Sequence, residues 1–490
     1  MRPIKRTKSL CPECLQVLEA LVYEDGGCVY ISKSCPQHGE YTDIYWSDYE
    51  FYRWAEKWEV VGNGVSNPQR KREKGCPYDC GLCENHKTCT VLGIIDVTNR
   101  CNLNCPICFA HAGAVGYLYE PSSEQVRQML KNLRGIRPIP PTALQYSGGE
   151  PTVRKDLPEL VAMAKEEGFR HVEVNSNGIV LAKSLEYYKS LLDAGMSTVY
   201  LQFDGLTDDI YVKTRGIPLL DVKLKVIENA RKLKHDSIVL VVTLVRGVND
   251  HQLGDIVRFA AKNCDVVRGV NVQPVSITGR INRAEREKMR ITIPDFMKLC
   301  EEQTNGAIKV SDFRPVPWPV ALARAVGALK GKSYPEFTAH PHCGVATFLL
   351  VEGDEIVPVT RYADVDKMAE DLWEVYKLAS EGKKFRAYLK LMRTAGLVKG
   401  RLRRSLLNVL IRGSYNALGQ LMRRMVLLGC MHFMDPYNFD LERVERCCIH
   451  YALPDGTIRP FCSYNSIHRP VVEKALSIPY PAKAESASHG

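Results

Sequence analysis

Long apolar runs are missing from this sequence of 490 residues: no uncharged segment reaches the roughly 18 residues that a membrane-spanning helix requires. The first residues, Met1–Arg6, also lack the apolar segment of a secretory signal. Both absences predict a cytoplasmic protein. In that reducing compartment the 18 cysteines are expected to bind metals rather than to form disulfides.

Acidic residues are absent from Gly382 to Met434, a stretch that carries twelve lysines and arginines among many aliphatic residues. Such a basic amphipathic segment predicts peripheral contact with a membrane surface, because each basic residue near anionic lipid contributes about 1 kcal/mol. Nucleic acid attracts the same charge, but few aromatic side chains are present for base stacking, so no nucleic-acid partner is expected. An ordinary solvated helix pair is the remaining alternative.

Hydrophobic residues make up 45% of the chain and charged residues 25%, which is typical of a soluble globular protein. The length exceeds that of one ordinary core, so several domains are expected. Cysteine clusters and strand patterns divide the chain into an N-terminal metal domain (1–62), a cluster-binding segment (63–90), an α/β barrel (91–313) and a C-terminal cluster-binding and lipid-binding domain (314–490).

Three cysteines, Cys101, Cys105 and Cys108, stand at the spacing C-x3-C-x2-C directly after the apolar run 92–97. The spacing brings three thiolates onto one loop that leaves a predicted strand. Three thiolates can hold a 4Fe-4S cluster and leave one iron without a protein ligand. The alternatives are a pair of buried cysteines or a zinc site, but structural zinc requires four closed ligands. The loop is therefore predicted to carry catalysis through the open iron.

Two further motifs follow the next predicted strands: Y-S-G-G-E-P at 146–151 and N-S-N-G at 175–178. Together with the cysteine loop they resemble the radical S-adenosylmethionine (SAM) superfamily. The resemblance implies that the open iron binds SAM and that an electron, supplied by a low-potential donor, splits it into methionine and a 5'-deoxyadenosyl radical. One departure is Ile107, because an aromatic residue often precedes the third cysteine in the superfamily.

The resemblance also implies which residues contact the cofactor. The SAM amino group would meet Gly148, Gly149 and Glu150. Its ribose or carboxylate would meet Asn175 and Asn177.

Short β-branched runs alternate with amphipathic helical segments between residues 91 and 313. The expected strands are 93–98, 143–147, 172–175, 198–203, 238–244 and 266–272, and the expected helices are 123–133, 157–167, 185–194, 219–233 and 253–262. Six such units predict an α/β fold with a parallel sheet that closes part way into a barrel. This agrees with the partial (β/α)6 barrel that the resemblance implies.

Polar residues near the strand ends are further candidates for the site. Gln202 and Asp204 alternate with apolar residues and therefore share one strand face, which is expected to point into the barrel. Arg215 is a natural clamp for the SAM carboxylate, because a guanidinium pairs with a carboxylate in a bidentate fork. Asn271 and Gln273 are candidates for contact with adenine.

The N-terminal domain is predicted to bind one metal ion. Cys11 and Cys14 are separated from Cys28 and Cys35 by a short hairpin, which is typical of a knuckle around one tetrahedral ion. The same four thiolates suit zinc or rubredoxin-like iron. His38 could replace one cysteine, but it is interpreted as a loop residue.

Two auxiliary 4Fe-4S clusters complete the predicted set of three. The first would be held by a second C-x3-C-x2-C motif and the cysteine after it: Cys76, Cys80, Cys83 and Cys89. The second would be held by four of the five C-terminal cysteines: Cys343, Cys430, Cys447 and Cys462. Cys448 is left out, because adjacent residues of an extended chain project in opposite directions.

Taken together, these motifs cover almost the whole chain and resemble the archaeal tetraether lipid synthases. That resemblance implies coupling of the terminal methyl carbons of isoprenoid chains in archaeal ether phospholipids, with two SAM molecules consumed per bond. Radical SAM methylases that act on a pterin share the same double cysteine motif and are the alternative. The basic amphipathic stretch favours the lipid reaction, whereas a pterin would require a polar, hydrogen-bonding pocket.

Overall fold

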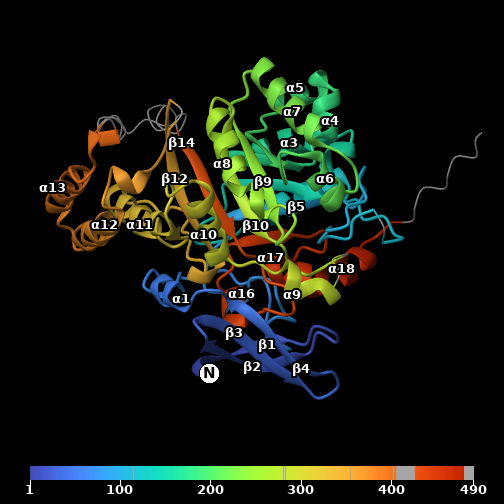
Figure 1. Ribbon diagram of the computed structural model, residues 1–490, viewed down its shortest axis with the longest axis horizontal. Coiled ribbons are helices and arrows are strands. Elements are labelled where there is room, and N and C mark those ends of the chain that lie inside the picture. Colours follow the sequence, from blue (N-terminus) through green and yellow to red (C-terminus); the bar gives the residue numbers. More distant parts are fainter. Residues whose placement is uncertain are drawn as a thin grey trace, which may run out of the picture.

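The computed structural model describes residues 1–113, 115–279, 281, 283–353, 355–400, 402–403 and 425–478. These residues form a small N-terminal sheet, a large central sheet with helices on its outer side, and a group of helices that projects from one edge (Figure 1). No helix among the described residues is long and apolar enough to cross a membrane.

The N-terminal sheet contains four antiparallel strands in sequence order. They are β1 (Arg2–Leu10), β2 (Val17–Asp25), β3 (Cys28–Cys35) and β4 (Gly39–Trp46). The following helix α1 (Tyr49–Glu56) begins at Asp48, whose carboxylate accepts a hydrogen bond from the Phe51 amide at 3.0 Å. Alternate residues of β3, such as Val29 and Ile31, are fully buried, so one face of this sheet packs into the protein.

Six parallel strands form the centre of the large sheet, close to their predicted positions. They are β5 (Leu92–Thr98), β6 (Ala143–Gly148), β7 (His171–Ser176), β8 (Thr198–Gln202), β9 (Ile238–Leu244) and β10 (Val267–Pro274). In β7, Val172 and Val174 join the hydrophobic core, so Glu173 and Asn175 point to the opposite side, into the barrel. The partial α/β barrel is confirmed.

Helices connect these strands and cover the outside of the barrel (Figure 1). They are α2 (Ser123–Arg134), α3 (Leu157–Glu166), α4 (Ile179–Lys183), α5 (Leu185–Asp193), α6 (Asp208–Arg215), α7 (Leu220–Lys232) and α8 (Leu253–Lys262). Helix α2 begins with a capping box, in which the Ser122 and Gln125 side chains exchange hydrogen bonds with each other's backbone amides.

Strands that follow residue 313 extend both edges of the same sheet. They are β11 (Arg314–Pro315), β12 (Gly344–Glu352), β13 (Glu355–Pro358), β14 (Met425–Met431), β15 (Ile449–Ala452) and β16 (Ile458–Pro460). Strand β14 lies parallel to β10, and β15 lies parallel to β5. The predicted division at residue 313 therefore crosses a continuous sheet.

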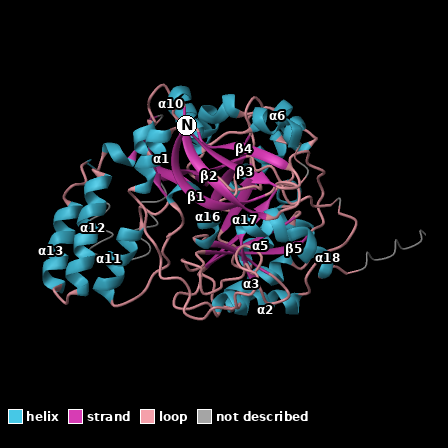
Figure 2. Ribbon diagram, turned by 90° about the horizontal axis from the view of Figure 1, so that it is seen from below, coloured by secondary structure: helices cyan, strands magenta, loops and turns pink. Residues whose placement is uncertain are grey.

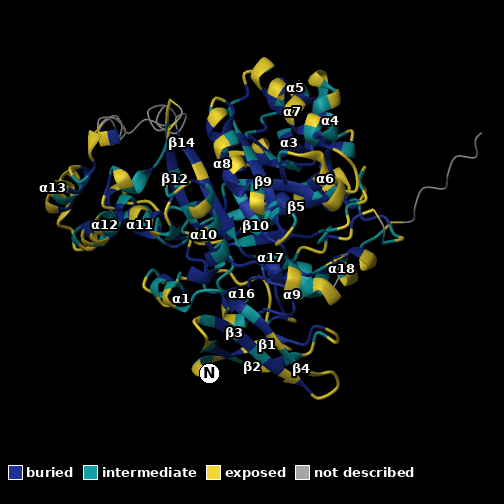
Figure 3. Ribbon diagram, in the orientation of Figure 1, coloured by how far each residue is buried: buried dark blue, intermediate teal, exposed yellow. Residues whose placement is uncertain are grey.

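The remaining helices lie around the sheet. They are α9 (Arg286–Met289), α10 (Ile293–Gln303), α11 (Val320–Lys330), α12 (Val365–Ser380), α13 (Lys384–Ala395), α16 (Leu441–Glu445), α17 (Phe461–Ser463) and α18 (Arg469–Ala475). Helices α11, α12 and α13 lie side by side at one end of the molecule (Figure 2). Figure 3 shows exposed residues along α13, whereas the central strands are largely buried.

Helix α13 is the first part of the basic stretch. Its Lys390 forms ion pairs with Asp371 at 3.0 Å and Glu374 at 2.6 Å, both on α12. Residues 401 and 404–424, which carry Arg401, Arg404, Arg412, Arg423 and Arg424 of the basic stretch, lie outside the described residues.

Buried charges join the N-terminal sheet to the barrel. Asp440, just before α16, accepts hydrogen bonds from Lys5, Thr7 and Tyr45 at 2.7–2.9 Å. Removing one partner of such a buried group would leave an unpaired charge, which typically costs about 3–5 kcal/mol. The N-terminal sheet is therefore fixed to the same body as the barrel.

Candidate active site

The first cysteine motif lies on a loop that Asn99 closes. The Asn99 side chain donates to the Tyr117 carbonyl at 2.9 Å and accepts from the Tyr119 amide at 3.0 Å, and its own carbonyl accepts from the Gly113 amide at 2.9 Å. Cys101, Cys105 and Cys108 all line one cavity of about 160 Å³ at the carboxyl ends of the barrel strands.

The three thiols fit a metal cluster. Burial raises the pKa of Cys101 to about 12 and also raises the pKa of Cys105, which the nearby Arg215 opposes. Because burial disfavours the charged thiolate, a nearby positive charge is needed to stabilise it, and bound iron supplies that charge. Among the described residues, no fourth cysteine lines this cavity. The donor set thus suits a 4Fe-4S cluster with one open iron.

Gly148 and Gly149 lie directly against the exit of β5. The Gly149 amide donates to the Thr98 carbonyl at 2.8 Å. Gly148 has a φ of +132°, and a Cβ atom there would lie 2.1 Å from the Thr98 carbonyl oxygen. Only glycine fits this close approach. The turn brings the backbone of both glycines to the cavity wall.

Glu150 borders the cavity, but its carboxylate is engaged inside the protein. It accepts hydrogen bonds from the amide and hydroxyl of Thr152, the hydroxyl of Ser176 and the amide of Asn177, at 2.5–3.1 Å. Burial raises the pKa of Glu150, and these donors oppose the rise. Four donors fill most of the capacity of a carboxylate. Glu150 therefore fastens the ends of β6 and β7 together.

Asn175 and Asn177 both line the cavity, as the sequence predicts. The Asn177 amide donates to the Asn102 side chain at 2.7 Å, which ties the end of β7 to the cysteine loop. The Asn175 amide makes a longer hydrogen bond of 3.3 Å to Ser147.

Of the predicted pair Asp204 and Arg215, only Arg215 lines the cavity. Asp204 is fully buried, accepts two hydrogen bonds from Arg215 at 2.6 and 2.9 Å, and accepts a third from the Thr243 amide at 3.1 Å. The Asp204 oxygens thus face the guanidinium rather than the cavity. Burial would lower the pKa of Arg215, but Asp204 outweighs this and the pKa is raised. A permanent cation therefore stands beside Cys105.

Lys223 on α7 is a functional candidate that sequence reasoning missed. Its ammonium group donates to the Gln202 side chain at 2.8 Å and to the Asn177 carbonyl at 2.5 Å, so it positions two cavity residues. Burial lowers the pKa of Lys223 to about 7. The signal was present in the sequence, since Lys223 falls on the buried stripe of the helix with Val226 and Ile227.

Aromatic side chains form another wall of the cavity. The rings of Phe433 and Phe461 stack with centroids 3.9 Å apart, and Phe109 lies 6.1 Å from Phe461. The departure at Ile107 is accommodated, because both Ile107 and Phe109 line the cavity.

The N-terminal metal site differs from its prediction in one ligand. Ligand atoms of Cys11, Cys14, Cys35 and His38 all lie within 4.8 Å of one another. Cys28 begins β3 and Cys35 ends it, so seven steps of about 3.3 Å place them on the order of 23 Å apart. The Cys28 thiol instead contacts the Ser47 carbonyl at 3.6 Å. The prediction of Cys28 as a ligand is wrong, and His38 takes its place.

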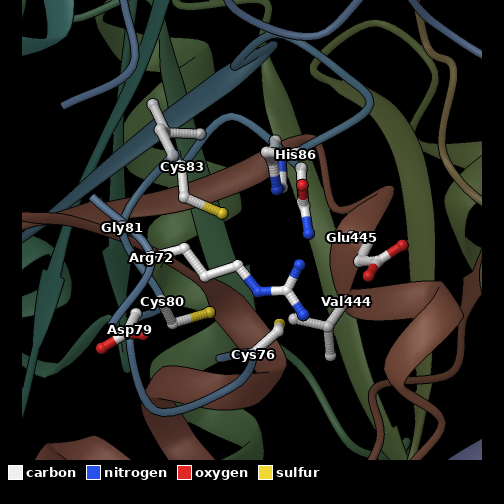
Figure 4. A pocket seen from close by; sticks show the side chains of 11 residues that line it. Arg72, Cys76, Asp79, Cys80, Gly81, Cys83, His86, Val444 and Glu445 are labelled. Carbon is white, nitrogen blue, oxygen red and sulfur yellow. The ribbon is translucent and has the colours of Figure 1, made fainter. Parts of the chain in front are cut away.

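The second cysteine motif forms a separate small pocket. Figure 4 shows the sulfur atoms of Cys76, Cys80 and Cys83 directed toward the space that the Arg72 side chain enters. Cys89 is not among the lining residues, and its thiol contacts the Gly64 carbonyl at 3.1 Å. Cys89, the fourth predicted ligand, therefore does not line the pocket that the other three cysteines line.

The C-terminal cysteines also differ from their prediction. Cys430 packs in the hydrophobic core of the barrel together with Cys300. Cys448, which was left out, packs against Cys343. Burial, and after it the charge of Cys343, raises the pKa of Cys448 to about 12. Burial also raises the pKa of Cys462 to about 12, with a smaller contribution from Cys343. Cys430 faces the core because residues alternate along β14.

Cys447 completes the C-terminal group. Burial raises its pKa, with further contributions from Cys462 and Cys448. Cys343, Cys447, Cys448 and Cys462 therefore influence one another electrostatically, and we refer to them as the C-terminal group. Ser463 contacts Cys80 at 3.0 Å, so this group lies next to the pocket of the second cysteine motif.

Comparison with known proteins identifies the class. Residues 95–260 match the model of the radical SAM superfamily, which spans the cysteine loop and most of the barrel. Residues 3–47 match the HMPTM N-terminal zinc ribbon domain. The chain is therefore a radical SAM protein with an N-terminal zinc ribbon.

A near full-length relative defines the family. The chain is 48% identical over 489 residues to 7,8-dihydro-6-hydroxymethylpterin dimethyltransferase of Methanocaldococcus jannaschii, covering 97% of this chain and 96% of that protein. The chain belongs to the family of this enzyme. GTP 3',8-cyclase of Limosilactobacillus fermentum is 28% identical over 215 residues, covering 42% of this chain and 60% of the cyclase. The crystal structure of Streptococcus suis SuiB is 18% identical, with a TM-score of 0.36, 45% of this chain covered and 47% of SuiB.

The family corrects the predicted reaction and partner. Coupling of archaeal lipid chains, with an ether phospholipid substrate and contact with the membrane surface, is overturned because the near full-length relative acts on a pterin. The basic stretch that favoured lipid is accordingly not evidence of a lipid substrate. In its described part, acidic residues of the neighbouring helix pair with Lys390.

Proposed function

We propose that this protein is a radical SAM methylase that acts on a 6-hydroxymethyl-7,8-dihydropterin. The observation that carries the proposal is the 48% identity to a pterin dimethyltransferase over nearly the full length of both chains.

The cavity chemistry supports a flat polar substrate. Amides and hydroxyls such as Asn175, Gln202, Thr243 and Gln273 line it together with the aromatic wall. An aromatic ring can stack on such a wall, and ring nitrogens and oxygens require hydrogen-bonding partners. A site for two long saturated chains would instead need a continuous apolar lining.

Cys101, Cys105 and Cys108 would hold the cluster, which with SAM supplies a carbon radical able to remove hydrogen from a carbon without an acidic proton. The resulting pterin radical would then take its methyl group from a one-carbon donor such as a second SAM, with one further electron from the reductant. The backbone of Gly148 and Gly149 would meet the SAM amino group, and Arg215 its carboxylate. Asp204 and Lys223 act as positioning residues, because they hold Arg215 and Gln202 in place. The stacked wall of Phe433 and Phe461 excludes water from the reacting centre.

Other metal sites belong to the same proposal. The zinc ribbon would hold zinc through Cys11, Cys14, Cys35 and His38. Two auxiliary clusters would be bound at the Cys76–Cys83 pocket and at the C-terminal group. A low-potential donor would supply the electrons.

The reaction can be tested with reconstituted protein, SAM, a strong reductant and the dihydropterin under anaerobic conditions. We expect methylated pterin by mass spectrometry from the wild type and from the control Cys264→Ala, which changes a cysteine outside the cavity. Cys105→Ala should give neither 5'-deoxyadenosine nor methylated pterin. A wild type that cleaves SAM but leaves the pterin unmethylated would contradict the proposal.

A further inference from the structure

Polar residues form two successive layers inside the barrel. The upper layer lines the cavity and contains Ser147, Asn175, Gln202 and Gln273, from β6, β7, β8 and β10. Two residues earlier on the same strands, and therefore on the same faces, lie Gln145, Glu173, Tyr200 and Asn271. Barrel interiors are usually filled by branched apolar side chains. A second polar layer below the cavity is therefore unnecessary for packing.

Glu173 is the charged member of the lower layer. Its side chain is buried, with 9% of the residue exposed. The Gln145 side chain opposes the rise in the pKa of Glu173, and burial followed by the charge of Glu173 raises the pKa of Tyr200. Among the described residues no lysine, arginine or histidine forms an ion pair with it, and burial raises its pKa to about 7. A buried carboxyl without a cation is costly to the fold, so its presence points to a use in binding.

A pterin carries hydrogen-bond donors that this buried carboxyl can accept. The pyrimidine ring of a pterin presents a ring N–H and an exocyclic amino group on one edge, next to a carbonyl oxygen. A carboxylate can accept both N–H groups, and a neighbouring amide can donate to the carbonyl. We propose that Glu173 and Gln145 form the subsite that recognises the amino-oxo edge of the pterin. This inference rests on the function proposed above.

The subsite sets the orientation of the substrate. Two strand residues span about 7 Å, so a fused two-ring heterocycle bound to the lower layer extends up to the cavity. The hydroxymethyl-bearing ring then faces the cysteine loop, where the radical chemistry takes place. Asn175 lies between Glu173 and the cavity. Its side chain donates a hydrogen bond of 3.3 Å to Ser147.

The test uses holoenzyme and two substrates: the dihydropterin and its analogue with oxygen in place of the 2-amino group. For the wild type we expect a marked preference for the amino compound. Glu173→Gln should raise KM for the amino compound by about tenfold to a hundredfold, because a hydrogen bond to a charged group is lost. It should also reduce the preference between the two substrates. The far-ultraviolet circular dichroism spectrum of the variant should match that of the wild type, which shows that the variant is folded.

The matched control is Glu186→Gln, which changes an exposed carboxyl on α5. It should leave KM and the preference as in the wild type. If Glu173→Gln also leaves both unchanged while the wild type methylates the dihydropterin, the subsite is refuted and the proposed function stands. A wild type that methylates neither compound overturns the function itself, and the subsite with it. Gln145→Leu provides a second variant, expected to raise KM in the same direction.

Discussion

Replacing Glu173 by Gln should stabilise the protein at alkaline pH. Burial raises the pKa of Glu173 from an ordinary value of 4.5 to about 7. The folded state therefore holds this proton more tightly than the unfolded state does. As pH rises from about 4.5 through about 7, the wild type loses stability that the uncharged variant keeps. Below both pKa values the substitution removes no charge, so the two proteins should behave alike.

The size of the effect follows from the pKa difference. The pKa of Glu173 rises from 4.5 to about 7. At about 1.4 kcal/mol per pKa unit, the ionised carboxylate destabilises the fold by about 3 kcal/mol. Unfolding entropy is about 2.1 cal/mol/K per residue. The corresponding gain in Tm is about 3 °C if the whole chain melts as one unit, and about 6 °C if the barrel melts alone.

Differential scanning calorimetry of anaerobic holoenzyme at about pH 5 and about pH 8.5 measures this difference. We expect the Tm of Glu173→Gln minus that of the wild type to increase between these two values. Glu186→Gln is the control, and its difference from the wild type should stay constant. A constant difference for Glu173→Gln as well would show that the carboxyl ionises freely in the folded protein, which would refute the reasoning.

Three further predictions concern the cofactor and metal sites. Asp204→Asn should weaken SAM binding by about tenfold and destabilise the fold, because it leaves the charge of its arginine partner buried and unpaired; equilibrium binding of SAM measures the first effect. His38→Ala should lose the N-terminal metal ion while Cys28→Ser keeps it, and metal analysis of purified protein would contradict the ligand set if the two results were reversed. Cys448→Ala should lower the iron content and Cys430→Ala should not, so equal loss from both would return Cys430 to the ligand set.

The central architecture was predictable because its signals are local. Strand β9, predicted at 238–244, has those same bounds in the structure. The predicted helix 253–262 likewise matches α8. Apolar residues repeat every two positions in a strand and about every four in a helix, and both patterns depend only on neighbours in sequence. These patterns therefore predict the barrel without knowledge of distant contacts.

Metal ligands were harder to assign, since ligation depends on where a strand ends. Cys28 and Cys35 were predicted to be one ligand pair of the knuckle, yet they occupy opposite ends of β3. Cys430, on β14 beside β10, joins the main hydrophobic core, whereas Cys448, just before β15, belongs to a small separate cluster with Val91 and Ala339. The spacing of cysteines in the sequence shows how many ligands are available, but not the direction in which each side chain points.

The roles of Glu150 and Asp204 show a similar limit. Both were placed at the site by sequence, but Glu150 lines the cavity whereas Asp204 is buried behind Arg215. Their carboxylates are filled by hydrogen bonds from segments far along the chain, such as Asn177 and Thr243. Which polar group meets the cofactor and which supports it depends on these long-range partners. The basic stretch misled for the same reason, since the acids that pair with Lys390 lie on another helix.

The most direct test of the account follows hydrogen from the substrate to the cofactor product. Holoenzyme is supplied with SAM, a reductant and a dihydropterin that carries deuterium on its saturated ring carbon and hydroxymethyl carbon. The account predicts methylated pterin together with deuterium in the 5'-deoxyadenosine. Formation of 5'-deoxyadenosine without deuterium, and with the pterin unchanged, would contradict it.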